Sequence, residues 1–71
     1  MKRKALKLLR VKHDLTQDQM SEKLGIARST YHCIELGIRR GSVEFWEKLQ
    51  QEFNIPNSEM YALQKMGEIE E

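Results

Sequence analysis

The sequence predicts a compact all-α fold with five helices, and three observations support this prediction. In five short segments, apolar residues recur three or four positions apart, which places them on one face of a helix. Residues that favour helix starts and ends separate these segments. The chain has 71 residues and shows no internal repeat, linker or low-complexity stretch, so its length fits a single domain.

The second segment has the clearest boundaries. Thr16 and Gln19 have the spacing of a capping box, in which each side chain binds a backbone N–H of the other residue. Gly25 can adopt the left-handed conformation that often ends a helix. The sequence therefore predicts one helix over about Lys4 to His13 and a second that begins after Thr16 and ends at Gly25.

A third helix is predicted from about Arg28 to Leu36. Tyr31 and Ile34 lie three positions apart, so they share the face that packs inward. The outer positions of this helix carry polar side chains. Two short helices joined by a glycine turn can cross at nearly a right angle, which leaves the outer face of the second free to enter a DNA major groove. This polar face is the first candidate for function.

Two more helices are predicted after a basic loop that contains Arg39 and Arg40. Ser42 is a candidate N-cap of the fourth helix. The apolar residues that follow helical spacing in that helix are Val43, Trp46, Leu49 and Phe53. The fifth helix begins at Asn57 or Ser58. Its apolar stripe consists of Met60, Leu63 and Met66.

Charge is distributed unevenly along the chain. Residues 1–40 contain ten Lys or Arg and four Asp or Glu, whereas residues 41–71 contain two Lys or Arg and seven Asp or Glu. The net charge of +1 therefore conceals a basic amino-terminal part, which suits a polyanionic partner, and an acidic carboxy-terminal part, which does not. An accidental asymmetry of a solvated surface is the alternative interpretation.

Several function classes find no support in the sequence. No run of ~18 apolar residues indicates a membrane span, so we expect a cytoplasmic protein that does not bind membranes. Cys33 is the only cysteine, which excludes an internal disulfide, and no spaced set of ligands indicates a metal. Because candidate catalytic residues are not clustered, we predict that the chain is not an enzyme and uses no cofactor.

The chain resembles the phage repressor and Cro type of helix-turn-helix proteins, the xenobiotic-response-element-like regulators. The resemblance extends from about Leu6 to Leu63. The matching signals, weak alone but in a common register, are Leu9-Arg10, Leu15-Thr16-Gln17, Met20, Leu24-Gly25-Ile26, Arg28-Ser29-Thr30-Tyr31, Ile34-Glu35, Gly37, Ser42, Glu47-Lys48-Leu49 and Ile55-Pro56. The resemblance implies a lambda-repressor-like DNA-binding domain over residues 1–67, with the helix-turn-helix at the second and third helices, and an acidic tail over residues 68–71.

The resemblance also implies roles for individual residues. The base-reading candidates are Arg28, Ser29, His32 and Cys33. Arg28 is the strongest of them, because a guanidinium can donate two hydrogen bonds to O6 and N7 of guanine. The candidates for binding phosphate are Thr16, Gln17, Thr30, Arg39 and Arg40. Arg10 and Glu35 resemble an ion pair that joins the first helix to the end of the third.

Plainer interpretations stay open for some positions. Arg39 and Arg40 can belong to a solvated loop, and His32 can be an ordinary exposed histidine. A redox role for Cys33 lacks a resolving cysteine.

Some residues depart from the usual pattern of the family, and two of these departures lie in or next to the third helix. Ala27 stands where a Ser or Thr usually caps the third helix, so this helix is expected to begin without that cap. Tyr31 stands where Ile or Val is commoner, and its hydroxyl needs a polar partner or water.

We predict double-stranded DNA as the partner, bound as a palindromic operator by a weak homodimer, because one short helix reads few bases. The candidate dimer residues on the fifth helix are Met60, Tyr61, Leu63, Gln64 and Met66. This stripe can instead close the core of a monomer.

The predicted function is sequence-specific transcriptional regulation, as a repressor of phage, plasmid or bacterial mobile-element type. The alternative is a protein-interaction module on the same fold, such as the antitoxin of a toxin–antitoxin pair, with a protein as its partner. Salt-dependent DNA binding distinguishes the first from stable co-purification of a partner in the second.

Overall fold

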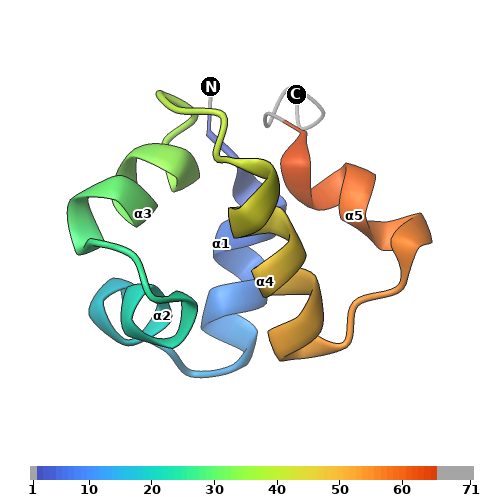
Figure 1. The fold of residues 1–71 in the computed structure, drawn as a ribbon, viewed down its shortest axis with the longest axis horizontal. Helices are drawn as coiled ribbons and strands as arrows, with labels where there is room; N and C mark the ends of the chain where they lie inside the picture. Colours follow the sequence, from blue (N-terminus) through green and yellow to red (C-terminus); the bar gives the residue numbers. More distant parts are fainter. Residues whose placement is uncertain (1, 66–71) are drawn as a thin grey trace.

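Five α-helices follow one another along residues 2–65, the part of the chain that this computed structural model describes (Figure 1). They are α1 (Lys4–Lys12), α2 (Gln17–Leu24), α3 (Arg28–Glu35), α4 (Val43–Phe53) and α5 (Asn57–Gln64). No strand occurs within residues 2–65, and the predicted all-α architecture is confirmed. None of these helices is both long enough and apolar enough to cross a lipid bilayer. Met66 and the predicted acidic tail, residues 68–71, lie outside the described residues.

Side-chain caps define the starts of α2 and α4 as the sequence predicted. Thr16 Oγ1 accepts a hydrogen bond from the Gln19 amide at 3.1 Å, and Gln19 Oε1 accepts one from the Thr16 amide at 2.9 Å. Ser42 Oγ accepts a hydrogen bond from the Phe45 amide at 3.0 Å. α3 begins after Ala27 without a side-chain cap. α1 and α3 each end one residue earlier than predicted, because the last expected residue serves as the C-cap.

One hydrophobic core joins the helices. Its buried side chains are Leu6, Met20, Leu24, Tyr31, Ile34, Phe45, Trp46, Leu49, Ile55, Met60 and Leu63. α2 packs against α3 and α4, whereas α1 packs against α3 and α5. The α2–α3 pair therefore lies at one side of the molecule (Figure 1), where the face of α3 that points away from the core is not covered by another helix.

The structure corrects one expectation about this core. Val43 is the first residue of α4 and is 73% exposed, so it does not belong to the buried stripe. Phe45 is buried instead, and its ring centroid lies 4.8 Å from that of Trp46. Burying two adjacent aromatic rings removes more apolar surface from water than burying a valine, and α4 is oriented accordingly.

The loop before α4 is closely packed, and two glycines allow this packing to be tested. Gly41 and Gly25 both have left-handed φ angles, of +83° and +70°. A Cβ atom at Gly41 would lie 2.9 Å from Trp46 Nε1 and 3.2 Å from Phe45 Cδ2, whereas a Cβ atom at Gly25 would meet no atom of another described residue within 4 Å.

We expect Gly41→Ala to lower the free energy of unfolding by more than Gly25→Ala does. Gly25→Ala carries only the cost of a left-handed backbone, about 1 kcal/mol. Gly41→Ala adds displacement of a buried indole that is hydrogen-bonded to the loop. Denaturant unfolding of both variants measures the difference, and equal losses would contradict close packing at Gly41.

Candidate nucleic-acid interface

α3 presents a polar face to solvent because its apolar residues are buried on the opposite side. Tyr31 and Ile34 are 0% and 2% exposed. Arg28, Ser29 and His32 are exposed, and Cys33 is half-buried. Three of the four residues proposed to read bases are thus fully accessible to a large ligand, and the fourth is partly accessible.

Arg28 contacts α2 through an exposed ion pair. Its Nε atom lies 3.1 Å from Asp18 Oδ1, and the two side chains are 63% and 76% exposed. An ion pair in water contributes at most about 1 kcal/mol to stability, so the guanidinium can leave Asp18 at little cost. The contact keeps Arg28 at the junction of α2 and α3 and leaves it available to another acceptor.

Gln17 connects the first turn of α2 to two residues of α3. Its Nε2 donates a hydrogen bond to Glu35 Oε1 at 3.0 Å, and its Oε1 lies 3.1 Å from His32 Nδ1. Because an amide oxygen can only accept, the second contact places a hydrogen on Nδ1 of His32. One hydrogen of the Gln17 amide group remains to donate to a ligand.

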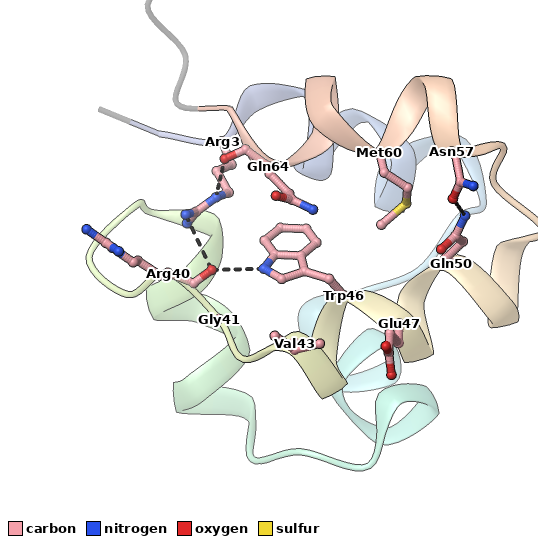
Figure 2. Close-up of a pocket in the computed structure, with 10 residues that line it drawn as sticks. All are labelled: Arg3, Arg40, Gly41, Val43, Trp46, Glu47, Gln50, Asn57, Met60 and Gln64. Carbon is pink, nitrogen blue, oxygen red and sulfur yellow. Dashed lines mark hydrogen bonds between the residues drawn. The ribbon is translucent and has the colours of Figure 1, made fainter.

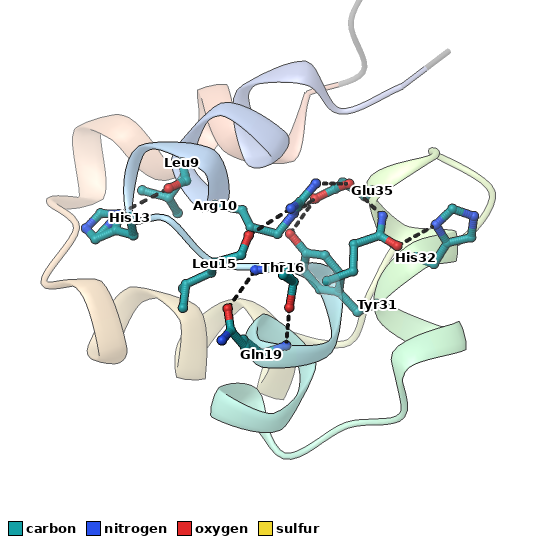
Figure 3. A network of polar contacts seen from close by, with 10 residues as sticks. Leu9, Arg10, His13, Leu15, Thr16, Gln19, Tyr31, His32 and Glu35 are labelled. Carbon is teal, nitrogen blue, oxygen red and sulfur yellow. Dashed lines mark hydrogen bonds and ion pairs between the residues drawn. The ribbon is translucent and has the colours of Figure 1, made fainter.

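Glu35 is a buried carboxylate that three helices share (Figure 3). Arg10 on α1 donates from Nε to Oε2 at 2.8 Å and from Nη2 to Oε1 at 3.3 Å. Tyr31 on α3 donates its hydroxyl hydrogen to Oε2 at 2.6 Å, so this hydroxyl has the polar partner that it requires. The bond from Gln17 completes the set. The side chains of Arg10 and Glu35 are only 12% and 7% exposed, so the ion pair is largely removed from water.

The network also sets the charge of its members. Burial on its own would raise the pKa of Glu35, but the hydrogen bonds from Arg10, Tyr31 and Gln17 and the charge of Arg10 together lower it. The pKa of Tyr31 is raised by burial and by the hydrogen bond to Glu35, so the hydroxyl stays protonated and continues to donate. The pKa of Arg10 is raised, chiefly by its hydrogen bond to Glu35.

Arg3 is a further residue of this interface, and the sequence did not identify it. Arg3 is 4% exposed, and its guanidinium donates to the carbonyl oxygens of Ile34 at 2.6 Å, Arg39 at 2.7 Å and Arg40 at 3.5 Å. Trp46 Nε1 donates to the same Arg40 oxygen at 3.0 Å (Figure 2). Two buried side chains therefore hold the backbone of the loop, while the Arg39 and Arg40 side chains remain exposed.

The same arginine reaches the end of α5. Arg3 Nε donates to the Gln64 carbonyl oxygen at 2.9 Å, and Arg3 Cζ lies 5.5 Å from the centroid of the Trp46 ring (Figure 2). Burial lowers the pKa of Arg3. From the sequence, an arginine within a basic run is expected to be exposed to solvent, and no local pattern indicates that Arg3 is buried.

The residues proposed to bind phosphate lie along α2, α3 and the loop that follows. Thr16 Oγ1 already accepts the Gln19 amide, so only its hydroxyl hydrogen is free to donate. Thr30 and Arg39 line one common cavity, which connects α3 to the loop. Because Gln17 contacts His32, a phosphate-binding candidate and a base-reading candidate are neighbours in the fold.

The candidate dimer residues on α5 divide into two groups. Met60 and Leu63 are each 8% exposed within the protein's own core, so the structure removes these two from the predicted interface. Their burial closes α5 onto the domain. Tyr61 is 70% exposed, and Gln64 is exposed as well. Met66 lies outside the described residues.

Acid should weaken the fold partly through Glu35. Because the pKa of Glu35 in the folded chain lies below its ordinary value of 4.5, its ionised form stabilises the fold at neutral pH. That stabilisation is lost as the pH falls through the pKa of the folded form. We expect Glu35→Gln to lower the free energy of unfolding at neutral pH by about 3 kcal/mol, because Arg10 loses its buried counter-charge.

On acidification, the Glu35→Gln variant should then lose less additional stability than the wild type. Denaturant unfolding at neutral pH and at about pH 3 measures this difference. Glu22→Gln removes an exposed carboxylate and should follow the wild type. Parallel losses in the wild type and Glu35→Gln would show that Glu35 does not contribute to the acid response.

Comparison with known proteins agrees with this architecture. The helix-turn-helix domain family matches residues 4–67 of the chain. A curated protein of Vibrio cholerae, the cryptic phage CTXphi transcriptional repressor RstR, is 33% identical over 54 residues, which are 76% of this chain and 49% of that repressor. The chain therefore spans about half the length of this curated relative. No solved structure matches the chain at a significant level.

The family match includes all five helices of the described fold. It therefore covers α2 and α3 together with the helices that hold them in place. With the similarity to a phage repressor, it confirms the resemblance to the phage repressor and Cro type that the residues indicated. The chain belongs to the helix-turn-helix domain family.

Proposed function

We propose that this protein is a sequence-specific, double-stranded DNA-binding transcriptional regulator that acts as a repressor, of phage, plasmid or bacterial mobile-element type. The observation that carries the proposal is the exposed polar face of α3, which the Gln17 and Glu35 contacts hold against α2. A major groove about 12 Å wide accepts one α-helix presented in this way. Similarity to a phage transcriptional repressor supports repression as the outcome of binding.

Base reading is assigned to the outer face of α3. Arg28 exchanges its exposed ion pair with Asp18 for two hydrogen bonds to guanine. Ser29 donates or accepts according to the base it meets. His32 uses Nδ1 toward Gln17, so Nε2 faces the DNA as an acceptor when the ring is neutral and as a donor when it is protonated. Cys33 supplies weak polar or apolar contact.

Phosphate contacts are assigned to the residues that surround this face, namely Thr16, Gln17, Thr30, Arg39 and Arg40. The first turn of α2 adds backbone amides and the positive end of a helix dipole. Contacts of this kind fix the register of a protein on the duplex without reading its sequence. Occupation of promoter DNA is the proposed mechanism of repression, and it requires no catalytic step.

A weak homodimer on a palindromic operator is the proposed binding form. The recognition helices of such a dimer lie about 34–36 Å apart, one turn of the duplex. Of the candidate dimer residues on α5, Tyr61 and Gln64 are exposed and remain available for this contact. A small contact of this size fits a dimer that forms mainly on DNA.

Selection of bound duplexes from a random pool should yield a preferred sequence. Arg28→Ala should weaken binding to the selected duplex by about 1–3 kcal/mol and change binding to random duplexes much less, because it removes a base contact. Fluorescence anisotropy with both duplexes at one salt concentration measures the two effects. Equal weakening on both duplexes would reassign Arg28 to phosphate binding.

The matched control is Arg39→Ala, which removes a proposed phosphate contact. This variant should weaken binding to both duplexes by the same factor. It should also reduce the slope of log affinity against log salt by about 0.9. If the wild type binds no duplex even at low ionic strength, the proposed function is wrong.

Sedimentation velocity tests the homodimer. The wild type should form dimers at high micromolar concentration or on a duplex with two half-sites, and Tyr61→Arg should reduce the dimer fraction at the same concentration. Leu8→Arg changes an exposed apolar residue on α1 and should leave association unchanged. A wild type that stays monomeric both free and on DNA would exclude the dimer.

A further inference from the structure

A cationic groove with a volume of about 350 Å³ adjoins the proposed DNA-binding face. Among residues 2–65, five of its lining residues are the Lys and Arg side chains of residues 2–10, and Glu35 is the one lining residue with a carboxylate. Gln17 and His32 also line it. The groove therefore connects the amino-terminal segment and α1 with the residues of α2 and α3 that are proposed to meet DNA.

Within the described residues, positive charge dominates this groove because the carboxylate of Glu35 is already paired. Glu35 forms its ion pair with Arg10 at 2.8 Å. The Arg3 guanidinium donates to backbone carbonyl oxygens, and it forms no ion pair with a carboxylate among residues 2–65 that line the groove. Lys2 and Lys7 are exposed at the groove. A concave surface lined by one sign of charge concentrates the field and attracts counter-ions of the opposite sign.

The position of the groove favours one source of anions. Gln17 lies in the first turn of α2, and His32 lies on the exposed face of α3, with 3.1 Å between their contacting atoms. A duplex that contacts both residues carries phosphates past the mouth of the groove. Lysine ammonium groups are mobile point charges that suit phosphate oxygens and do not select a base.

We propose that this groove binds a phosphodiester of the operator backbone, with Lys2 and Lys7 as direct contacts to phosphate oxygens. The proposal rests on the proposed function and extends the DNA footprint from the helix-turn-helix onto the amino-terminal segment and α1. Lys2 and Lys7 then contribute to affinity and to the placement of the protein on the duplex, and they do not contribute to the choice of sequence.

The test compares lysine-to-glutamine variants in their salt dependence. Lys2→Gln and Lys7→Gln should each reduce the slope of log affinity against log salt by about 0.9, and the double variant by about twice as much. The loss of affinity should be the same factor for a selected duplex and a random one. Lys48→Gln on α4 makes the same change of charge at an exposed site that does not line the groove, and its slope should equal that of the wild type.

Each outcome of this experiment decides a separate point. If the wild type binds DNA and the groove variants keep its slope, or change it no more than Lys48→Gln does, the groove does not bind phosphate and the proposal is wrong. If the wild type binds no duplex, the proposed function fails first. Both lysines are exposed, so thermal unfolding of the variants should match that of the wild type and exclude misfolding as the cause of weaker binding.

Discussion

The placement of α3 depends on the hydrogen bonds that the buried carboxylate of Glu35 accepts. This carboxylate accepts hydrogen bonds from Arg10 on α1, Gln17 on α2 and Tyr31 on α3. Burying a carboxylate without hydrogen-bond donors or a counter-charge would cost several kcal/mol of desolvation free energy. The fold can therefore bury Glu35 only if it brings these donors to it. This requirement orients α3 relative to α1 and α2 more specifically than apolar packing, which tolerates small rotations.

A second buried charge, that of Arg3, organises the loop that follows the same end of α3. The Arg3 guanidinium donates hydrogen bonds to carbonyl oxygens of the loop after α3 and of the end of α5. The ring of Trp46 packs against this guanidinium. Buried side chains therefore fix the backbone of the loop that carries Arg39 and Arg40, while the side chains of these two residues are exposed to solvent. In the proposed complex with DNA, a loop whose backbone is already fixed would lose less conformational entropy on binding.

The two networks separate structural from ligand-binding roles among the charged residues. Arg3 and Arg10 are committed to buried partners, whereas Arg28 has only a weak exposed ion pair. The sequence predicted which face of α3 is buried, because the spacing of its apolar residues indicates that face. The DNA-binding roles of the exposed residues rest on the family pattern and stay predictions. Gln17 contributes to the fold through its hydrogen bond to Glu35, and it is also a proposed contact to DNA.

Local signals in the sequence specify all five helices. The capping box joins Thr16 and Gln19, which are three positions apart. The apolar residues of α3 lie within two turns of one helix. Both patterns can therefore be identified from the sequence alone. The burial of Arg3 and the exposure of Val43 come from the assembled fold. Arg3 bonds to a carbonyl 61 positions away, and Val43 is exposed on a helix whose Phe45 ring lies 6.3 Å from that of Tyr31 on α3. Such partners meet only when distant segments pack together, and no local pattern records them.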